Sequence, residues 1–240
     1  MRTRLTALLL AAAAGAALMA QAARPADRTW TTSFVIDSGE LVTTGRNPYF
    51  ILEPGYVLTL EDRDTRLVIT VLNETQRIDS VDTRVVEERE TSKSQPVEVS
   101  RNFFAISKRT NAVFYFGEDV DMYKNGQVVS HEGAWRAGVN GARFGLALPG
   151  LPLVSAKYYQ EIAPGVAMDR AEILGLNETV KTPAGEFKDV LKVTETTPLE
   201  PAVREFKYYA NGVGLIQDGS LRLVKYGPAF ALRASAGKRE

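Results

Sequence analysis

The chain has 240 residues, and its 29 basic residues balance 29 acidic ones, so it lacks the basic excess that a nucleic-acid partner requires. One histidine and no cysteine exclude Cys–His catalysis and any thiolate or multi-histidine metal site. An exported protein without disulfides must be held together by its core, which a chain of this length can supply.

The N-terminus predicts a cleavable signal peptide over residues 1–22. Arg2 and Arg4 provide the positive start, an apolar run covers residues 5–20, and residues 20–22 match an A-x-A cleavage site. The run is short and rich in alanine, and no later segment resembles a membrane span, so no transmembrane anchor is expected after cleavage. We therefore expect a periplasmic or secreted protein, with a retained N-terminal anchor as the alternative.

Residues 23–230 predict a single β domain, followed by a flexible tail over residues 231–240. Runs rich in Val, Ile, Thr and aromatic residues alternate with Gly, Asn and Pro turn signals. The expected strands cover residues 30–36, 56–60, 66–72, 84–88, 97–107, 112–116, 190–197, 205–210 and 221–226. Because joined hairpins must bury one face, the expected fold is all-β: an antiparallel meander forming a barrel, half-barrel or sandwich.

An internal repeat is visible in the sequence. The run Leu72-Asn73-Glu74-Thr75 recurs at residues 176–179, and each copy is followed by a proline and then by two aromatic residues and an alanine, at 103–105 and 208–210. Matches in the same order predict two duplicated halves, at about 48–119 and 157–219, with a unique insert at about 120–156. Convergence of similar hairpins on similar turn residues is the alternative.

The insert contains a strong hairpin signal at Asn125-Gly126, since both residues tolerate positive φ. Extending the ladder from this turn pairs Asp121 with Ser130 and Asp119 with Glu132. Strand alternation then places Asp119, Asp121 and Glu132 on one face, and His131 on the other face with Val120 and Met122.

Three acids on one face repel each other, so something must compensate for their charge. Solvent screening, Arg136 or Arg143 as partners, and a bound hard cation such as calcium are the three alternatives. The third makes Asp119, Asp121 and Glu132 the candidate metal ligands, although the sequence does not fit the helical calcium-loop pattern.

Aromatic residues supply the candidate ligand-binding positions. Adjacent aromatic pairs place one ring on each face of a strand, so one ring of each pair lines a cavity or stands on a half-wet surface. We select Phe103, Tyr159 and Tyr208 from these pairs, and Trp135 from the long glycine-rich loop, where packing is the competing interpretation. No residue is selected as catalytic.

The C-terminal third resembles a group of bacterial exported domains of unknown function. The resemblance rests on Thr182-Pro183-Ala184-Gly185-Glu186-Phe187 and on Tyr208-Tyr209-Ala210-Asn211-Gly212-Val213-Gly214, which follow a TPAGxF…YYAxGVG pattern. These domains are similar to periplasmic lipoprotein-carrier half-barrels. The resemblance implies a curved antiparallel sheet and a non-catalytic envelope role, and it carries no catalytic residues with it.

The leading hypothesis is a non-catalytic exported binding or carrier module for an apolar or lipid-like envelope ligand, without a cofactor. One alternative is a cation-assisted hydrolase or lyase, in which Asp119, Asp121 and Glu132 hold the metal and His131 acts as the base. Another is a structural assembly factor that presents edge strands to an envelope protein.

Overall fold

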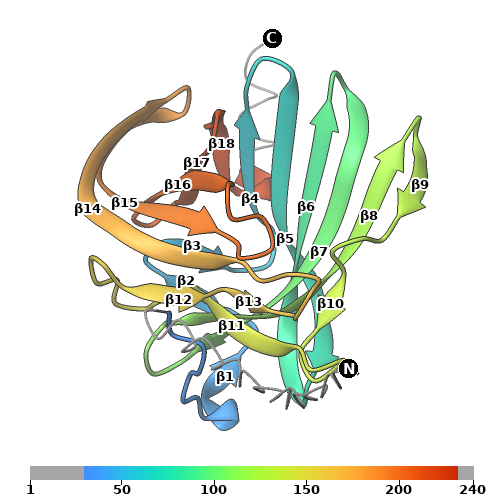
Figure 1. Ribbon diagram of the computed structural model, residues 1–240. Coiled ribbons are helices and arrows are strands. Elements are labelled where there is room, and N and C mark those ends of the chain that lie inside the picture. Colours follow the sequence, from blue (N-terminus) through green and yellow to red (C-terminus); the bar gives the residue numbers. More distant parts are fainter. Residues whose placement is uncertain (1–29, 232–240) are drawn as a thin grey trace, which may run out of the picture.

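The computed structural model describes residues 30–231, which form one large antiparallel sheet that curves into a nearly closed barrel (Figure 1). The expected all-β class is confirmed, and the barrel is the form it takes. Sixteen strands belong to this sheet, and β2 and β3 form a small second sheet. The predicted signal peptide and residues 232–240 of the predicted tail lie outside the described residues. Within the described part, no helix is long and apolar enough to cross a membrane.

The first half of the described chain contains a 3-10 helix at Ser38–Glu40 and the strands β1 (Leu41–Val42), β2 (Gly45–Asn47), β3 (Phe50–Leu52), β4 (Tyr56–Glu61), β5 (Thr65–Ile78), β6 (Val81–Ser92), β7 (Gln95–Ser107) and β8 (Val113–Lys124). The second half contains β9 (Gln127–Ser130), β10 (Trp135–Arg136), β11 (Arg143–Leu148), β12 (Lys157–Tyr159), β13 (Glu161–Ile162), β14 (Arg170–Thr182), β15 (Gly185–Thr196), β16 (Arg204–Ala210), β17 (Gly214–Asp218) and β18 (Leu221–Pro228).

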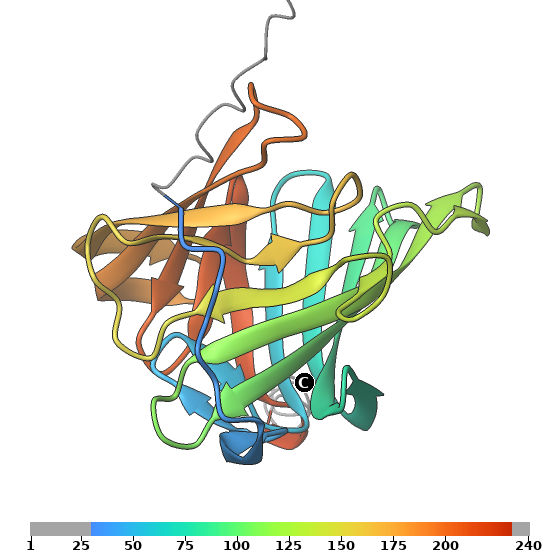
Figure 2. The same ribbon diagram turned by 60° about the horizontal axis from the view of Figure 1, so that its bottom comes forward.

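Most neighbours in the sheet are also neighbours in sequence. The strands β4 to β8 form one meander and β14 to β18 another, and the pairing of β18 with β4 joins them. In Figure 1, β5 to β8 form one wall, β14 to β16 form the opposite wall, and β11 to β13 cross in front. The β8–β9 hairpin projects from the side of the barrel in both views (Figures 1 and 2).

The barrel closes through one short segment that belongs to both edges of the sheet. Its first part, β12, pairs with β14, and its second part, β13, pairs with β11. Gln160 lies between the two, and we call residues 157–162 the seam. Gly145 of β11 allows the seam to approach, since a Cβ atom at this position would lie 2.2 Å from the Gln160 carbonyl oxygen.

Residues 30–36 do not form the expected strand. A single bridge joins Thr31 to Tyr158, and the rest of the segment is irregular. The apolar side chains that suggested a strand instead pack against the barrel: the ring of Phe34 lies 6.2 Å from that of Phe114 and 6.5 Å from that of Phe144. Tertiary packing here replaces the ladder hydrogen bonds that the composition favoured.

The two proposed repeat copies have the same strand order. The first copy contains β5-β6-β7-β8 and the second β14-β15-β16-β17, each as adjacent antiparallel strands. The repeated Leu-Asn-Glu-Thr run also lies at a register shift in both, between Val71 and Thr75 in β5 and between Gly175 and Glu178 in β14. Both features are compatible with duplication, which remains a prediction.

Candidate functional site

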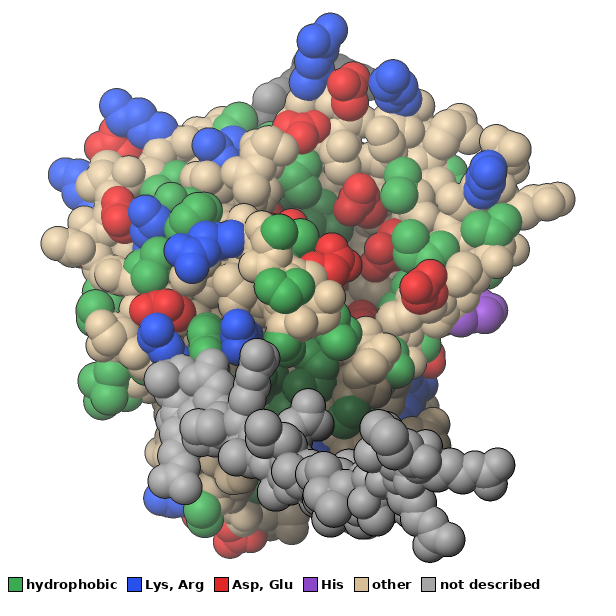
Figure 3. Space-filling model, viewed as in Figure 1, with side chains coloured by type: hydrophobic (Ala, Val, Ile, Leu, Met, Phe, Trp, Pro, Cys, Tyr) green, Lys and Arg blue, Asp and Glu red, His purple; other side chains and the backbone are tan. Residues whose placement is uncertain are grey.

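The barrel encloses a cavity of about 360 Å³ between its two walls. In Figure 3, acidic side chains surround a hollow at the centre of the molecule's face, and hydrophobic side chains lie deeper inside. The apolar part of the lining comes from Tyr49, Phe50, Ile51, Tyr56, Leu58, Ile69, Val71, Val86, Phe104, Tyr115, Ala147, Leu148, Tyr209 and Leu215.

Strand alternation explains why polar and apolar groups share this interior. On β7, every second residue lines the cavity, so Glu98, Ser100 and Asn102 lead down to Phe104. On β6, Val86 and Glu88 follow the same rule. The cavity-facing side chains of β6 and β7 are thus apolar deep in the cavity and polar toward one end of each strand.

A β-bulge in β8 turns an acidic residue of this strand, Glu118, toward the cavity. Asn102 of β7 lies opposite Glu118, but Phe104 lies opposite Tyr115, so β8 has one residue more than its partner between these pairs. The bulge occurs at Gly117, whose φ of 142° suits glycine, and a Cβ atom there would lie 2.4 Å from the Trp135 carbonyl oxygen. As a result, both Tyr115 and Glu118 face the cavity despite their odd spacing.

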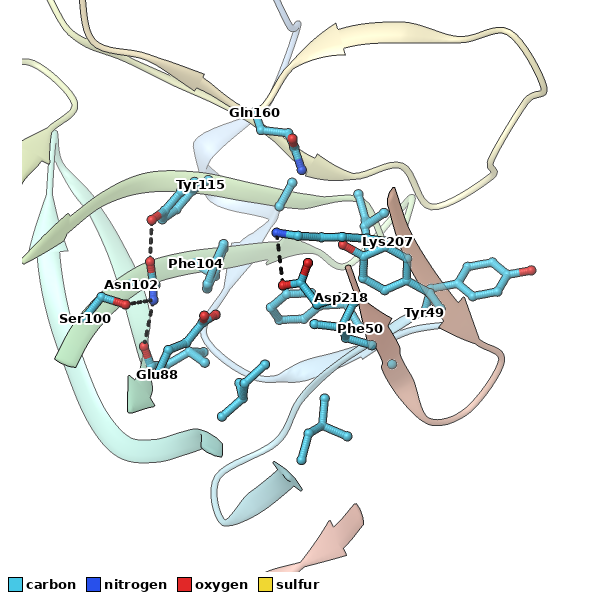
Figure 4. Close-up of a pocket in the computed structure, with 18 of the residues that line it drawn as sticks. Tyr49, Phe50, Glu88, Ser100, Asn102, Phe104, Tyr115, Gln160, Lys207 and Asp218 are labelled. Carbon is cyan, nitrogen blue, oxygen red and sulfur yellow. Dashed lines mark hydrogen bonds and ion pairs between the residues drawn. The ribbon is translucent and has the colours of Figure 1, made fainter. Parts of the chain in front are cut away.

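Aromatic rings form part of the cavity base. Phe104 stacks on Tyr115 with ring centroids 4.6 Å apart, and Phe50 meets Phe104 edge-on at 5.0 Å. The Tyr115 hydroxyl donates a hydrogen bond to Asn102 Oδ1, and Asn102 Nδ2 donates to Ser100 Oγ at 3.1 Å (Figure 4). These bonds fix the stacked rings in place.

The single cation of the cavity lining is held between two acids. Lys207 Nζ lies 2.7 Å from Glu195 Oε2 and 3.8 Å from Asp218 Oδ2 (Figure 4). Burial disfavours the charge of this ammonium group, but the fields of Glu195 and Asp218 raise the pKa of Lys207 well above its usual range. Lys207 is therefore fully charged and already paired.

The remaining acids carry perturbed pKa values. Burial, partly opposed by Lys207, raises the pKa of Glu88 to about 7. Burial and the charge of Glu88 raise the pKa of Glu118 to about 8, and burial and the charge of Glu118 raise the pKa of Glu161 well above normal. Burial also raises the pKa values of Glu98, Asp169 and Asp218. Some of these groups are therefore protonated near neutral pH.

Two buried polar atoms of the seam have no hydrogen-bond partner: Tyr158 Oη and Gln160 Oε1. Gln160 points toward the cavity (Figure 4), and its Nε2 donates to Glu195 Oε1 at 2.9 Å. Each unsatisfied buried group costs about 1–3 kcal/mol. Native proteins tolerate few such groups, so their concentration on one side of the cavity is informative.

The four aromatic residues selected from the sequence do not line this cavity. Phe104 and Tyr209 line it, whereas their neighbours Phe103 and Tyr208 point to the other face of the sheet. Tyr159 packs on Trp30, with ring centroids 6.2 Å apart. The adjacent-pair argument located the correct strands, but alternation alone does not reveal which face is concave. Ligand contacts of these residues remain a prediction.

Trp135 is 6% exposed and packs edge-on against Tyr115, with ring centroids 5.4 Å apart. It borders a second, shallower hollow of about 400 Å³ together with Arg136 and Val139 of the glycine-rich loop. Its position favours the packing interpretation, because its ring supports the stacked floor of the main cavity from behind.

The acidic hairpin differs from the expected register. The turn at Asn125-Gly126 is present, but Met122 pairs with Ser130 instead of Val129. The expected pairs of Asp121 with Ser130 and Asp119 with Glu132 were therefore wrong, because a bulge follows Val128 and β9 ends at Ser130. Because β9 is short and exposed, it buries little side-chain surface that could fix a regular pairing register.

Each of the proposed metal ligands has a separate environment. Asp119 accepts a hydrogen bond from Arg136 Nη2 at 2.6 Å, so an arginine compensates this acid. Asp121 lies 2.9 Å from His131 Nδ1, which places the histidine beside an acid rather than on the opposite face. Glu132 is exposed in the following turn. Among residues 30–231, no three acidic or histidine side chains are grouped so that they could hold a metal ion.

Sequence reasoning missed the polar residues that line the cavity. A signal was present in β6 and β7, where acidic residues continue the same alternating row as core residues such as Val86 and Phe104. It could not be read as an interior row, because an acidic face normally indicates solvent.

No protein-family model, curated protein or solved structure matches this chain at a significant level.

Proposed function

We propose that this chain is an exported, non-catalytic binding or carrier module of the cell envelope, which holds a small apolar or lipid-like ligand inside its barrel. The observation that carries the proposal is the cavity of about 360 Å³ with an aliphatic and aromatic base. Ligand pockets typically measure roughly 300–1,000 Å³ and combine apolar walls with a few polar groups. This volume favours a single short chain or ring system.

The apolar base supplies the affinity in this proposal. Burial of ligand surface against Ile69, Val86 and Phe104 is favourable by about 25 cal/mol per Å² of apolar area removed from water. The stacked Phe104–Tyr115 pair is held by hydrogen bonds, so ligand binding does not have to order it. The predicted signal peptide supports a location in the periplasm or outside the cell.

The experiment measures binding of the neutral apolar probe N-phenyl-1-naphthylamine to delipidated protein, with native mass spectrometry of protein purified from its own host. We expect probe fluorescence to rise on binding and a small co-purified molecule to appear in the spectrum. Ile69→Trp fills the cavity and should abolish both signals. Val68→Trp, one residue away on the outer face of β5, is the matched control and should bind as wild type.

Two outcomes would contradict the proposal. One is a folded Ile69→Trp protein, with a wild-type circular dichroism spectrum, that still binds the probe with wild-type affinity. The other is wild-type protein that neither binds the probe nor carries a co-purified molecule. A stoichiometric protein partner in the same native spectrum would favour the assembly-factor alternative instead.

A further inference from the structure

The charges around the cavity are strongly unbalanced. The acids that line it come from nearly every wall: Glu88 of β6, Glu98 of β7, Glu118 of β8, Glu161 of β13, Asp169 before β14, Glu195 of β15 and Asp218 of β17. Lys207 of β16 is the one cation among the lining residues, and Glu195 and Asp218 already hold it. Burial and other acids have the largest effects on Glu118 and Glu161, and the hydrogen bonds that favour their ionised forms come from Tyr115 and Trp135. This side of the cavity thus gathers acidic groups with Lys207 as the one basic side chain of the lining, and burial and mutual repulsion raise their pKa values.

The hydrogen-bonding groups show the same bias. The two side-chain amides of the lining already use their N–H donors: Asn102 Nδ2 donates to Ser100 Oγ and to the Val86 carbonyl oxygen, and Gln160 Nε2 donates to Glu195. Acceptor positions remain free on the carboxyl groups and on Gln160 Oε1. A ligand that brings donors can use these acceptor positions.

An independent observation marks the same place. Tyr158 is 3% exposed, and its hydroxyl group lies near Glu195 without a hydrogen-bond partner. It precedes Gln160 by two residues in the seam, and Gln160 Nε2 donates a hydrogen bond to the same Glu195 at 2.9 Å. The indole nitrogen of Trp135 faces Glu161 and favours the ionised form of that carboxyl group. Unsatisfied buried groups are rare in native proteins, and here they converge on the seam beside these acids.

The geometry favours an organic cation over a metal ion. No three acids within residues 30–231 are grouped closely enough to hold a metal. An ammonium group on a carbon skeleton can reach carboxylates that are farther apart, because its N–H donors point in different directions.

We propose that the cavity binds a small primary amine in its ammonium form, whose charged nitrogen lies between Glu118 and Glu161 and whose hydrocarbon part lies on Phe104 and the aliphatic base. This inference rests on the proposed function, since it names the ligand class of the same cavity. Charge-assisted hydrogen bonds from the ammonium group to Glu118, Glu161 and Gln160 Oε1 would stabilise the ionised forms of the two acids.

Binding should be coupled to proton release. The titratable groups that act on Glu118 and Glu161 are Glu88, Glu98, Asp169, Glu195 and Tyr115. Lys207 is the one cation of the cavity lining, and Arg136 lies outside the lining with its Nη1 2.9 Å from the Glu118 carbonyl oxygen. Because burial raises the pKa of Glu118 to about 8, this carboxyl group holds a proton at pH 7. An ammonium ion must displace that proton, so its affinity should increase as the pH rises from 6 to 8.

The test compares three probes of similar shape: n-octylamine, n-octan-1-ol and octanoate. Isothermal titration calorimetry with delipidated wild-type protein, in buffers of different ionisation enthalpy, measures affinity and proton release together. We expect octylammonium to bind most tightly and to release protons at pH 7. Octanol should bind more weakly, because it contacts the apolar base of the cavity but provides no positive charge for the carboxyl groups. Octanoate should bind weakest of the three.

The double variant Glu118→Gln/Glu161→Gln keeps the shape and removes the charge. We expect it to lose about 10- to 100-fold in octylammonium affinity, with little change for octanol. Asp119→Asn is the matched control, because it removes a neighbouring charge on the outer face of the same strand and should leave octylammonium binding unchanged. Circular dichroism and octanol binding report whether each variant is folded.

The outcomes separate the two proposals. If octanol or octanoate binds as tightly as octylammonium, or if the double variant keeps wild-type octylammonium affinity, the amine inference is wrong while the binding function stands. If none of the three probes binds and N-phenyl-1-naphthylamine also fails to bind, the proposed binding function is itself wrong.

Discussion

At the scale of single residues, the carboxyl groups of the cavity have the largest effect on how this protein responds to pH. The pKa of Glu118 is about 8 in the folded chain, against an ordinary value of 4.5. Between these two values the folded state binds more protons than the unfolded state, so the free energy of unfolding falls as the pH rises. The stabilisation is complete below about pH 4.5 and is lost as the pH passes through 8.

We predict that Glu118→Gln stabilises the protein at pH 8 and has little effect at pH 5, because glutamine removes the cost of ionising a buried carboxyl group. The gain at pH 8 should be on the order of 1–2 kcal/mol, less than the full pKa shift implies, since the side chain retains some contact with water in the cavity. Thermal unfolding at both pH values measures it. An equal effect at pH 5 and pH 8 would contradict the assigned pKa.

Arg84 is a second residue with a defined structural role. It is 6% exposed, and its guanidinium group donates to the carbonyl oxygens of Thr43, Leu72 and Glu74 at 2.9, 3.4 and 3.3 Å. The last two oxygens belong to the β5 register shift, whose ladder bonds are interrupted. Arg84 thus satisfies the carbonyl groups that this irregularity exposes.

We predict that Arg84→Met lowers the free energy of unfolding by about 2–4 kcal/mol, because it leaves several buried carbonyl groups without a donor. Urea denaturation is the measurement. Arg77→Met is the matched control, because Arg77 is exposed and pairs only with Asp82 at the surface, so its loss should change stability by less than about 1 kcal/mol. A similar loss for both variants would mean that the Arg84 contacts are not responsible.

At the scale of elements, the seam is the least conventional part of the barrel. Ladder bonds join β12 to β14 and β13 to β11, and the segment between them depends on the close approach of β11. Gly145 permits this approach without any unusual φ, because its lack of a Cβ atom leaves room for the Gln160 carbonyl group.

We predict that Gly145→Ala displaces the seam and lowers the melting temperature by several degrees, since the added methyl group would meet backbone atoms rather than a movable side chain. Gly175→Ala in β14 is the control, because a Cβ atom at Gly175 meets nothing closer than 3.8 Å. Thermal unfolding followed by circular dichroism distinguishes them, and equal melting temperatures for the two variants would argue against a packing role for Gly145.

At the scale of the whole molecule, the acids that line one interior act together. Burial raises the pKa values of Glu88, Glu118 and Glu161, and each charge disfavours ionisation of the next. The barrel as a whole therefore prefers its carboxyl groups protonated, although the net charge of the sequence is +0 at pH 7.

We predict that wild-type stability is greater near pH 5 than at pH 8, because the folded pKa values of Glu88 and Glu118, about 7 and 8, both exceed 4.5. Melting temperatures at pH 5, 6.5 and 8 in buffers of equal ionic strength measure this trend. A stability maximum at pH 8 in ligand-free protein would contradict it.

The sequence by itself determined the class of fold and several of its turns. Alternating apolar residues between Gly, Asn and Pro signals are sufficient to predict an antiparallel meander, and Asn125-Gly126 was correctly assigned to a hairpin tip because few other residues accept positive φ. The tertiary structure alone decided which face of each strand is concave, where bulges change the alternation, and which aromatic residues line the cavity. Glu118 illustrates the reason: it faces the interior because one extra residue at Gly117 shifts the register, and acids read from sequence indicate solvent until the closed sheet surrounds them.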